Sequence, residues 1–117
     1  MTNKPYNNGE WTTARFNSFI KSALRNASLR WPAKHRVKKA AWIKRGVYRC
    51  AGFGRAAHEV PAKEVTVDHI LPIVDPKKGF VSWDELIERL FCDDKGLQVL
   101  CRECHQKKSN SEKRKRW

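Results

Sequence analysis

The feature that most constrains this chain is the dipeptide Asp68-His69, which lies near the end of the alternating stretch KEVTVDHI at 63–70. Alternation of polar and apolar residues with a period of two predicts a half-exposed β-strand. Pro72 and Pro76 follow, and they predict that the chain then enters a loop. Neighbouring strand residues point to opposite faces, so the carboxylate and the imidazole cannot both bind one ion in regular strand geometry. A division into one metal ligand and one general base is therefore expected.

A second block of chemistry-bearing residues lies in the stretch LQVLCRECHQKKS. Its first four residues, 97–100, predict a short strand, and a basic helix is expected from Arg102 onward. Cys101, Cys104 and His105 lie where this strand meets this helix. An isolated Asp-His pair is common and says little, but its combination with Cys-x-x-Cys-His further along the chain indicates a functional site.

The rest of the pattern predicts an α+β chain. Trp31, Trp42 and Trp83 are expected to be core or packing residues, and His58 is expected to lie in a loop after a glycine turn. The remaining expected elements are a helix from Thr12 or Thr13 to about Ala27, a helix from Pro32 to about Lys44 ended by Gly46, a strand over 47–50, and a helix over 82–92 capped by Ser82.

The charge is strongly positive and unevenly distributed. The chain carries a formal net charge of +13, and from Trp11 to His58 there are 12 lysines or arginines and no acidic residue. Such a surface attracts polyanions, of which nucleic acid is the commonest; an anionic membrane or an acidic protein is the alternative. The chain has no long apolar run and no signal-like start, which predicts a cytoplasmic, unsecreted protein. The residues expected to contact nucleic acid are Lys34, Arg36, Lys38, Lys39, Lys44, Arg45, Lys107 and Lys108.

The order strand, loop, strand, helix, with these residues in it, resembles the HNH endonuclease family and its ββα-metal fold. VDHILP resembles the first block of the family and CRECHQKKS the second, over about 47–110 of the chain. The stretch GFVSWDELIERLFC is most similar to the small HNH proteins of tailed phages. The resemblance implies an HNH core with a basic C-terminal helix or tail over 47–117. The expected basic helical arm over 1–46 lies outside the shared motif.

The resemblance also implies an activity, namely metal-dependent hydrolysis of DNA in a bacterial host, with homing as one role. It assigns His69 as general base and Asp68 and His105 as ligands of Mg²⁺, Mn²⁺ or another divalent ion. The chemistry agrees, because a base must deprotonate the attacking water and a cation must offset charge on the phosphate. An imidazole with an ordinary pKa near 6.5 suits the first role at neutral pH.

Gly96 departs from the family pattern, in which an asparagine stands before the Leu-Gln of the second strand. That asparagine resembles a brace for the loop carrying the Asp-His pair, and glycine has no side chain with which to replace it. Gly96 is expected to adopt the left-handed turn that asparagine also tolerates, with Asp93 or Asp94 as a substitute brace. The fold is then retained and catalysis is weakened. A DNA-binding module that no longer cleaves is the alternative function.

The cysteines raise the question of a structural zinc. Disulfides are not expected, because nothing in the sequence signals export. Cys50, Cys101 and Cys104 supply three of the four ligands that a closed zinc site requires. The fourth ligand is His58 or Cys92. Relatives place a second cysteine where this chain has Phe53, and that substitution favours a reduced cysteine cluster packed without metal. A zinc-ribbon interaction protein with no nucleic-acid role is a third reading.

Overall fold

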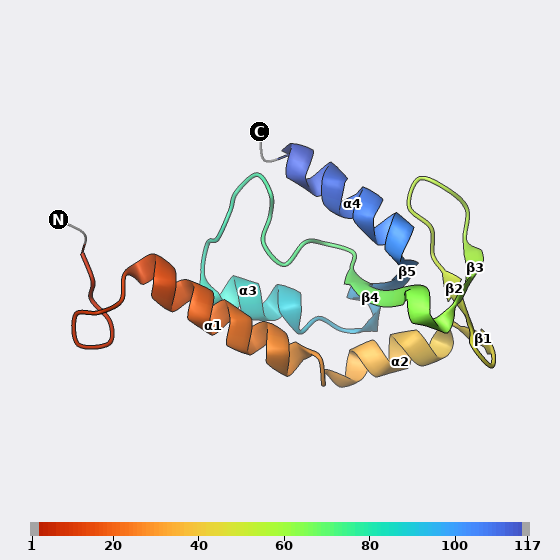
Figure 1. Cartoon of the computed structure of the whole chain (residues 1–117), viewed down its shortest axis with the longest axis horizontal. Helices are drawn as coiled ribbons and strands as arrows, with labels where there is room; N and C mark the ends of the chain where they lie inside the picture. Colours follow the sequence, from red (N-terminus) through yellow and green to blue (C-terminus); the bar gives the residue numbers. More distant parts are fainter. Residues whose placement is uncertain (1–2, 116–117) are drawn as a thin grey trace. The chain divides into compact units, whose positions relative to one another are not determined.

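The computed structural model describes residues 3–115, and it has an α+β fold (Figure 1). Within these residues there are four α-helices, two single-turn 3₁₀ helices and two small antiparallel sheets. The chain divides into two compact units between Arg30 and Trp31. The final residues of the expected core, 116 and 117, lie outside the described part.

The first unit is built around helix α1 (Thr13–Ser28). Thr12 caps it as predicted, since its hydroxyl accepts a hydrogen bond from the Arg15 amide at 3.1 Å. Before the helix, Tyr6 and Trp11 form a β-bridge, and the Tyr6 ring stacks on Phe16 with centroids 4.0 Å apart. The short N-terminal segment is therefore held to the helix by aromatic packing.

The second unit contains the remaining elements. The strands β1, β2 and β3 form one antiparallel sheet in that order, and β4 pairs with β5 in the other. The elements in chain order are α2 (Pro32–Ala40), β1 (Trp42–Lys44), β2 (Val47–Cys50), β3 (His58–Pro61), η1 (Ala62–Glu64), β4 (Val65–His69), α3 (Trp83–Leu90), η2 (Asp94–Gly96), β5 (Leu97–Cys101) and α4 (Arg102–Lys115).

Helix α2 ends earlier than its sequence predicted. Its last residue is Ala40 rather than Lys44, because Trp42–Lys44 forms β1 and pairs with β2 across a turn at Gly46. Aromatic and β-branched residues favour the pleated strand, and Gly46 takes the positive φ of 78° that this turn requires. The prediction that Trp42 is a core residue was wrong, since 54% of its surface is exposed.

Helix α2 packs against β4, β5 and η2, with Ala33 fully buried. The Trp31 indole N–H, just before this helix, donates to the Cys92 carbonyl at 2.6 Å. The boundary between compact units therefore falls before α2, whereas the sequence placed it between 46 and 47.

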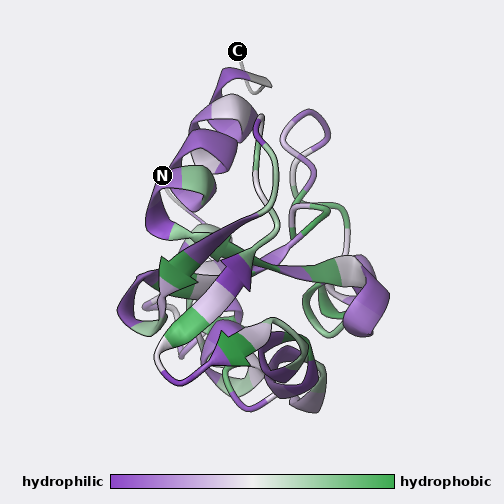
Figure 2. Ribbon diagram, turned by 90° about the vertical axis from the view of Figure 1, so that its right-hand side faces the viewer, coloured by the Kyte–Doolittle hydropathy of each residue, from purple (hydrophilic) through white to green (hydrophobic). Residues whose placement is uncertain are grey.

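The β4–β5 pair leads directly into α4, which packs on both strands. Hydrophobic colour is concentrated in the strands of Figure 2, whereas α4 is hydrophilic along most of its length. Leu97, Val99 and Leu100 of β5 are buried, together with Leu86 and Leu90 of α3. Helix α3 begins as predicted, because the Ser82 hydroxyl accepts from the Glu85 amide at 3.2 Å. The core of the second unit therefore includes apolar side chains of β5 and α3.

Candidate functional site

Asp68 lies at the centre of a polar cluster between β4 and α4. It is opposite Gln98 in the β4–β5 register, and the Gln98 amide donates to Asp68 Oδ2 at 3.0 Å. The other oxygen, Oδ1, is 3.6 Å from Nε2 of His105 in the first turns of α4. Asp68 is only 8% exposed, whereas the His105 side chain is 45% exposed. The strand and the helix therefore bring the two predicted ligands together at the edge of solvent.

The spacing of these atoms can be compared with that of an ion site. Two ligands about 2.1 Å from an octahedral ion, at a right angle to one another, lie about 3.0 Å apart. The observed 3.6 Å exceeds this by a few tenths of an ångström, which side-chain rotation can close. Oxygen and imidazole donors also suit a divalent ion of this kind. The spacing and the donor types of Asp68 and His105 are thus compatible with two ligands of a small divalent cation.

Lys108 occupies a place that its sequence context did not predict. It was expected on the nucleic-acid surface, but it is only 8% exposed. Its ammonium group lies 3.3 Å from Asp68 Oδ2, 2.9 Å from the His69 carbonyl and 2.6 Å from Glu112 Oε1. The side chain therefore ties α4 to the end of β4 and offsets part of the charge of Asp68.

His69 points away from Asp68, as strand alternation requires, and its ring lies near the end of α3. Nε2 is 2.8 Å from the carbonyl oxygen of Leu90. A carbonyl oxygen can only accept, so Nε2 carries the proton and Nδ1 of the neutral ring carries the free lone pair. Burial lowers the pKa of His69, while the hydrogen bond to Leu90 partly opposes that effect and nearby Lys34 adds to it. The hydrogen bond to Leu90 therefore fixes the orientation of the half-buried ring and leaves Nδ1 as the nitrogen that can accept a proton.

Gly96 stands where the resemblance to HNH proteins predicts an asparagine, and its backbone conformation differs from the one expected. It is not among the glycines with positive φ, so the predicted left-handed turn was wrong. Its carbonyl accepts the Ile70 amide at 2.9 Å and so braces the chain directly after His69. A Cβ on Gly96 would lie 2.8 Å from the Cys92 sulfur, so an alanine at this position would require the Cys92 side chain to shift. A backbone hydrogen bond, rather than a side chain, thus holds the segment that follows His69.

Asp93 and Asp94, the suggested substitutes for the brace, have other partners. The Asp93 carboxylate caps η2 by accepting from the Lys95 amide at 3.2 Å. Asp94 forms two-pronged hydrogen bonds with Arg36 at 2.8 to 3.1 Å, and this contact holds the pKa of Asp94 below its ordinary value. These pairings hold η2 in place.

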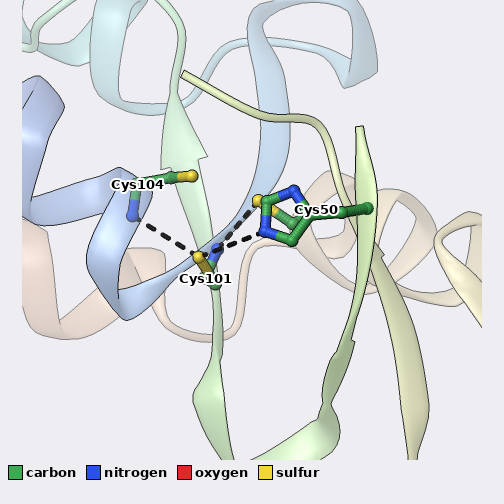
Figure 3. A group of neighbouring side chains, drawn as sticks. Cys50, Cys101 and Cys104 are labelled. Atoms are coloured by element: carbon green, nitrogen blue, oxygen red, sulfur yellow. Dashed lines mark hydrogen bonds between the residues drawn. The ribbon is translucent and has the colours of Figure 1, made fainter. Parts of the chain in front are cut away.

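A second cluster lies where β2, β3, β5 and α4 meet. One ligand atom from each of Cys50, His58, Cys101 and Cys104 lies within 4.8 Å of every other. Figure 3 shows the three cysteines approaching from β2, the end of β5 and the first turn of α4. His58 is directly opposite Cys50 in the β2–β3 register, and its Nε2 is 3.7 Å from the Cys101 sulfur. His58 is therefore a strand residue facing the cluster, and the expectation of a loop histidine was wrong.

Two sulfur atoms of this cluster, those of Cys50 and Cys101, accept hydrogen bonds from backbone amides. Cys50 accepts from the amides of Gly52 and Cys101 at 3.3 and 3.2 Å. Burial opposes ionisation of Cys101, but the Cys104 amide and the His58 ring lower the pKa of Cys101 to about 7. Burial raises the pKa of Cys104. Ionisation is thus favoured at Cys101 and opposed at Cys104.

The donor set fits a tetrahedral ion such as zinc. A sulfur about 2.3 Å and a nitrogen about 2.05 Å from a tetrahedral centre lie about 3.6 Å apart, which matches the 3.7 Å between Cys101 and His58. Cys92 is not a member of the set. Phe53, at the position where the resemblance to HNH proteins predicts a second cysteine, packs against the buried cluster. The cluster can therefore hold a metal ion, with His58 as the fourth ligand.

The predicted nucleic-acid residues fall into different environments. Arg36 pairs with Asp94 and Lys107 with Glu103, and both pairs are exposed. Lys34 is half-buried, and burial lowers its pKa. The exposed members of the set, besides these paired residues, are Lys38, Lys39, Lys44 and Arg45, all in or after α2.

Several site contacts were not predicted from the sequence. Gln98 lies directly opposite Asp68 in the β4–β5 register. This contact can be predicted only when the pairing of the two strands is known. The Leu90 carbonyl carries no sequence signal, since any residue has one. His58 could have been found only by recognising β3 as the partner of β2.

No protein-family model matches the chain, and neither a curated protein nor a solved structure matches it. None of the described helices combines the length and the apolar character needed to cross a membrane.

Proposed function

We propose that this chain is a metal-dependent endonuclease of the HNH type that hydrolyses phosphodiester bonds in DNA. The observation that carries the proposal is the juxtaposition of Asp68 Oδ1 and His105 Nε2 at 3.6 Å, beside a neighbouring His69 fixed by Leu90. The antiparallel β4–β5 pair followed by α4 has the order of a ββα-metal core. Phage origin and a role in homing belong to the same proposal.

In this mechanism each residue has a separate task. A divalent ion bound by Asp68 and His105 would supply positive charge to the scissile phosphate and to the departing oxygen. Gln98 holds the Asp68 carboxylate in place through its 3.0 Å hydrogen bond. The Leu90 carbonyl fixes the tautomer of His69, so that Nδ1 can take a proton from the attacking water. The Lys108 ammonium keeps β4 and α4 together beneath the site.

The proposal is tested by incubating supercoiled plasmid with the protein and Mg²⁺, and separately with Mn²⁺. Wild-type protein is expected to nick or linearise the plasmid. His69→Ala is expected to lower the rate by about 10²- to 10⁴-fold, the usual contribution of a general base. Asp68→Asn is expected to remove metal-dependent cleavage, whereas the matched Asp84→Asn, at an exposed position in α3, is expected to cleave normally. Equal activity of wild type and His69→Ala would rule out the proposed mechanism.

We also propose that the Cys50, His58, Cys101 and Cys104 set binds a structural Zn²⁺. Elemental analysis after dialysis should find about one zinc per chain. His58→Ala should lose most of it, whereas His35→Ala, an exposed histidine on α2, should retain it. Wild-type protein without zinc, and with three reactive thiols at the cluster, would show a reduced cysteine cluster instead.

A non-cleaving DNA-binding module is the second candidate, and the position of Lys108 favours it. An ammonium group 3.3 Å from Asp68 already neutralises part of the charge that would attract a divalent ion. This candidate predicts binding without cleavage. If about five phosphates are neutralised, the logarithm of the affinity should fall with a slope of about −4 to −5 against the logarithm of salt concentration. Cleavage that depends on Mg²⁺ and on Asp68 would exclude it.

A further inference from the structure

An exposed aromatic side chain lies in the basic part of the second unit. Trp42 is the first residue of β1 and lies directly opposite Tyr48 of β2, so the two rings share one face of the sheet. Trp42 is 54% exposed, whereas Tyr48 is half-buried. A tryptophan in the middle of a folded chain usually packs inside it, and this one presents its ring to solvent instead.

The surroundings of Trp42 form an open hollow with positive charge. The hollow holds about 830 Å³, counting the solvent in its mouth, and it is lined by His35, Lys38, Lys39, Trp42 and Tyr48. The Lys38 ammonium lies 5.6 Å from the centre of the Tyr48 ring. Helix α2 therefore supplies the basic groups and the β1–β2 hairpin supplies the aromatic ones.

The charges of this hollow are not neutralised within the described part of the chain. Among residues 3–115, no carboxylate forms an ion pair with His35, Lys38 or Lys39. Arg36, on the same helix, differs because Asp94 neutralises it. The hollow thus lacks an anionic partner and has an aromatic surface beside its cations.

We infer that this hollow binds an unpaired stretch of a nucleic-acid strand, with a base stacked on Trp42 and adjacent phosphates on Lys38 and Lys39. Bases within a duplex are stacked on one another, so only an unpaired or extruded base can offer its face to an exposed indole. Phosphates alone would need no aromatic surface, and an apolar ligand would gain nothing from unneutralised cations. The inference rests on the proposed function in taking nucleic acid as the ligand, and it adds a preference for unpaired strands at a separate site.

The inference is tested by fluorescence anisotropy with three labelled ligands on the same scaffold. They are a single strand of mixed sequence, its duplex, and the single strand with abasic sites at several positions. The abasic strand keeps its phosphates but lacks bases to stack. Measurements in the Asp68→Asn background prevent cleavage during binding.

Loss of one base–indole contact is expected to weaken binding about 5- to 150-fold. Trp42→Ala should lower affinity for the normal single strand by this factor and change affinity for the abasic strand little. Trp42→Phe should restore most of the loss, since phenylalanine also stacks. Lys44→Ala, a matched exposed change in the same strand, should weaken all three ligands alike because it removes charge only. Circular dichroism should show Trp42→Ala folded, since the side chain is exposed.

Equal binding of the normal and abasic strands, or an unchanged affinity in Trp42→Ala, would overturn the inference. If polyglutamate displaces the labelled single strand, and if its affinity falls in Trp42→Ala by the same factor, the inference is overturned in favour of an acidic protein partner. Failure of the nuclease proposal can be told apart from failure of this inference. In that case wild-type protein leaves the plasmid intact, but it still binds the normal single strand more tightly than the abasic strand. Absence of binding to every ligand would overturn both.

Discussion

Replacement of Gly96 by alanine is predicted to destabilise the protein through a contact with one neighbour. The new Cβ would lie 2.8 Å from the Cys92 sulfur and 3.1 Å from Cys92 Cβ, both closer than real Cβ contacts normally allow. Overpacking of this kind costs about 1–3 kcal/mol. Alanine restricts the unfolded chain and returns about 0.4–1 kcal/mol. The net loss in the free energy of unfolding is therefore about 0–2.6 kcal/mol, with a midpoint of about 1 kcal/mol.

Urea unfolding of four proteins measures this effect and its cause: wild type, Gly96→Ala, Cys92→Ala and the double variant. Because Cys92→Ala removes the sulfur, Gly96→Ala should cost about 1 kcal/mol less in that background than in wild type. The Ile70 amide, which donates to the Gly96 carbonyl, should also exchange with solvent faster in Gly96→Ala than in wild type.

Two results would refute this reasoning. Gly96→Ala at least as stable as wild type would mean that the gap accepts a methyl group without strain. An equal cost in both backgrounds would mean that the sulfur is not the obstacle, and that glycine is needed at this position for some other reason.

Three further predictions concern contacts around the site. Trp31→Phe removes the 2.6 Å hydrogen bond to the Cys92 carbonyl and keeps the ring contact with Phe91, so the unfolding free energy should fall by about 1–2 kcal/mol, and no change would argue against the bond. Lys108→Met removes the ammonium group that Asp68 and Glu112 share. The free energy of unfolding measured in urea should fall by about 3 kcal/mol. A variant more stable than wild type would refute the role of Lys108 in holding α4 to β4. Arg36→Ala should lower stability slightly at neutral pH, because the pKa of Asp94 is depressed in the folded state only. That contribution is present above the ordinary value of 3.8 and is lost as pH falls through the depressed value, so the two proteins should converge in acid.

Local signals in the sequence were sufficient for the elements whose termini are set by nearby residues. Thr12 and Ser82 accept hydrogen bonds from amides three residues ahead, so α1 and α3 begin where the caps predicted. The strands at 47–50 and 97–100 follow from short apolar runs. Sheet partners could not be read in this way, and so β1 and β3 were missed and α2 was drawn too long.

The residues of the candidate site also differ in how far the sequence predicts them. Asp68, His69 and His105 were predicted as site residues from their residue types and from the resemblance to HNH proteins, and the cysteines were singled out by their number and spacing. The role of Lys108 could not be, because a lysine in a basic helix is ordinarily solvated and only the packing of α4 on β4 buries it. The exposure of Trp42 was not predicted, because it depends on α2 ending at Ala40 and on Trp42 beginning β1.

The sequence by itself determined which chemical groups this protein has and where its capped helices begin, because residue type and capping act over a few positions. Only the tertiary structure decided which groups meet. Strand register sets His58 against Cys50 and Gln98 against Asp68, and helix packing brings Lys108 and His105 to the same carboxylate. Such contacts join residues far apart in the chain, and their pairing depends on how the whole core is buried.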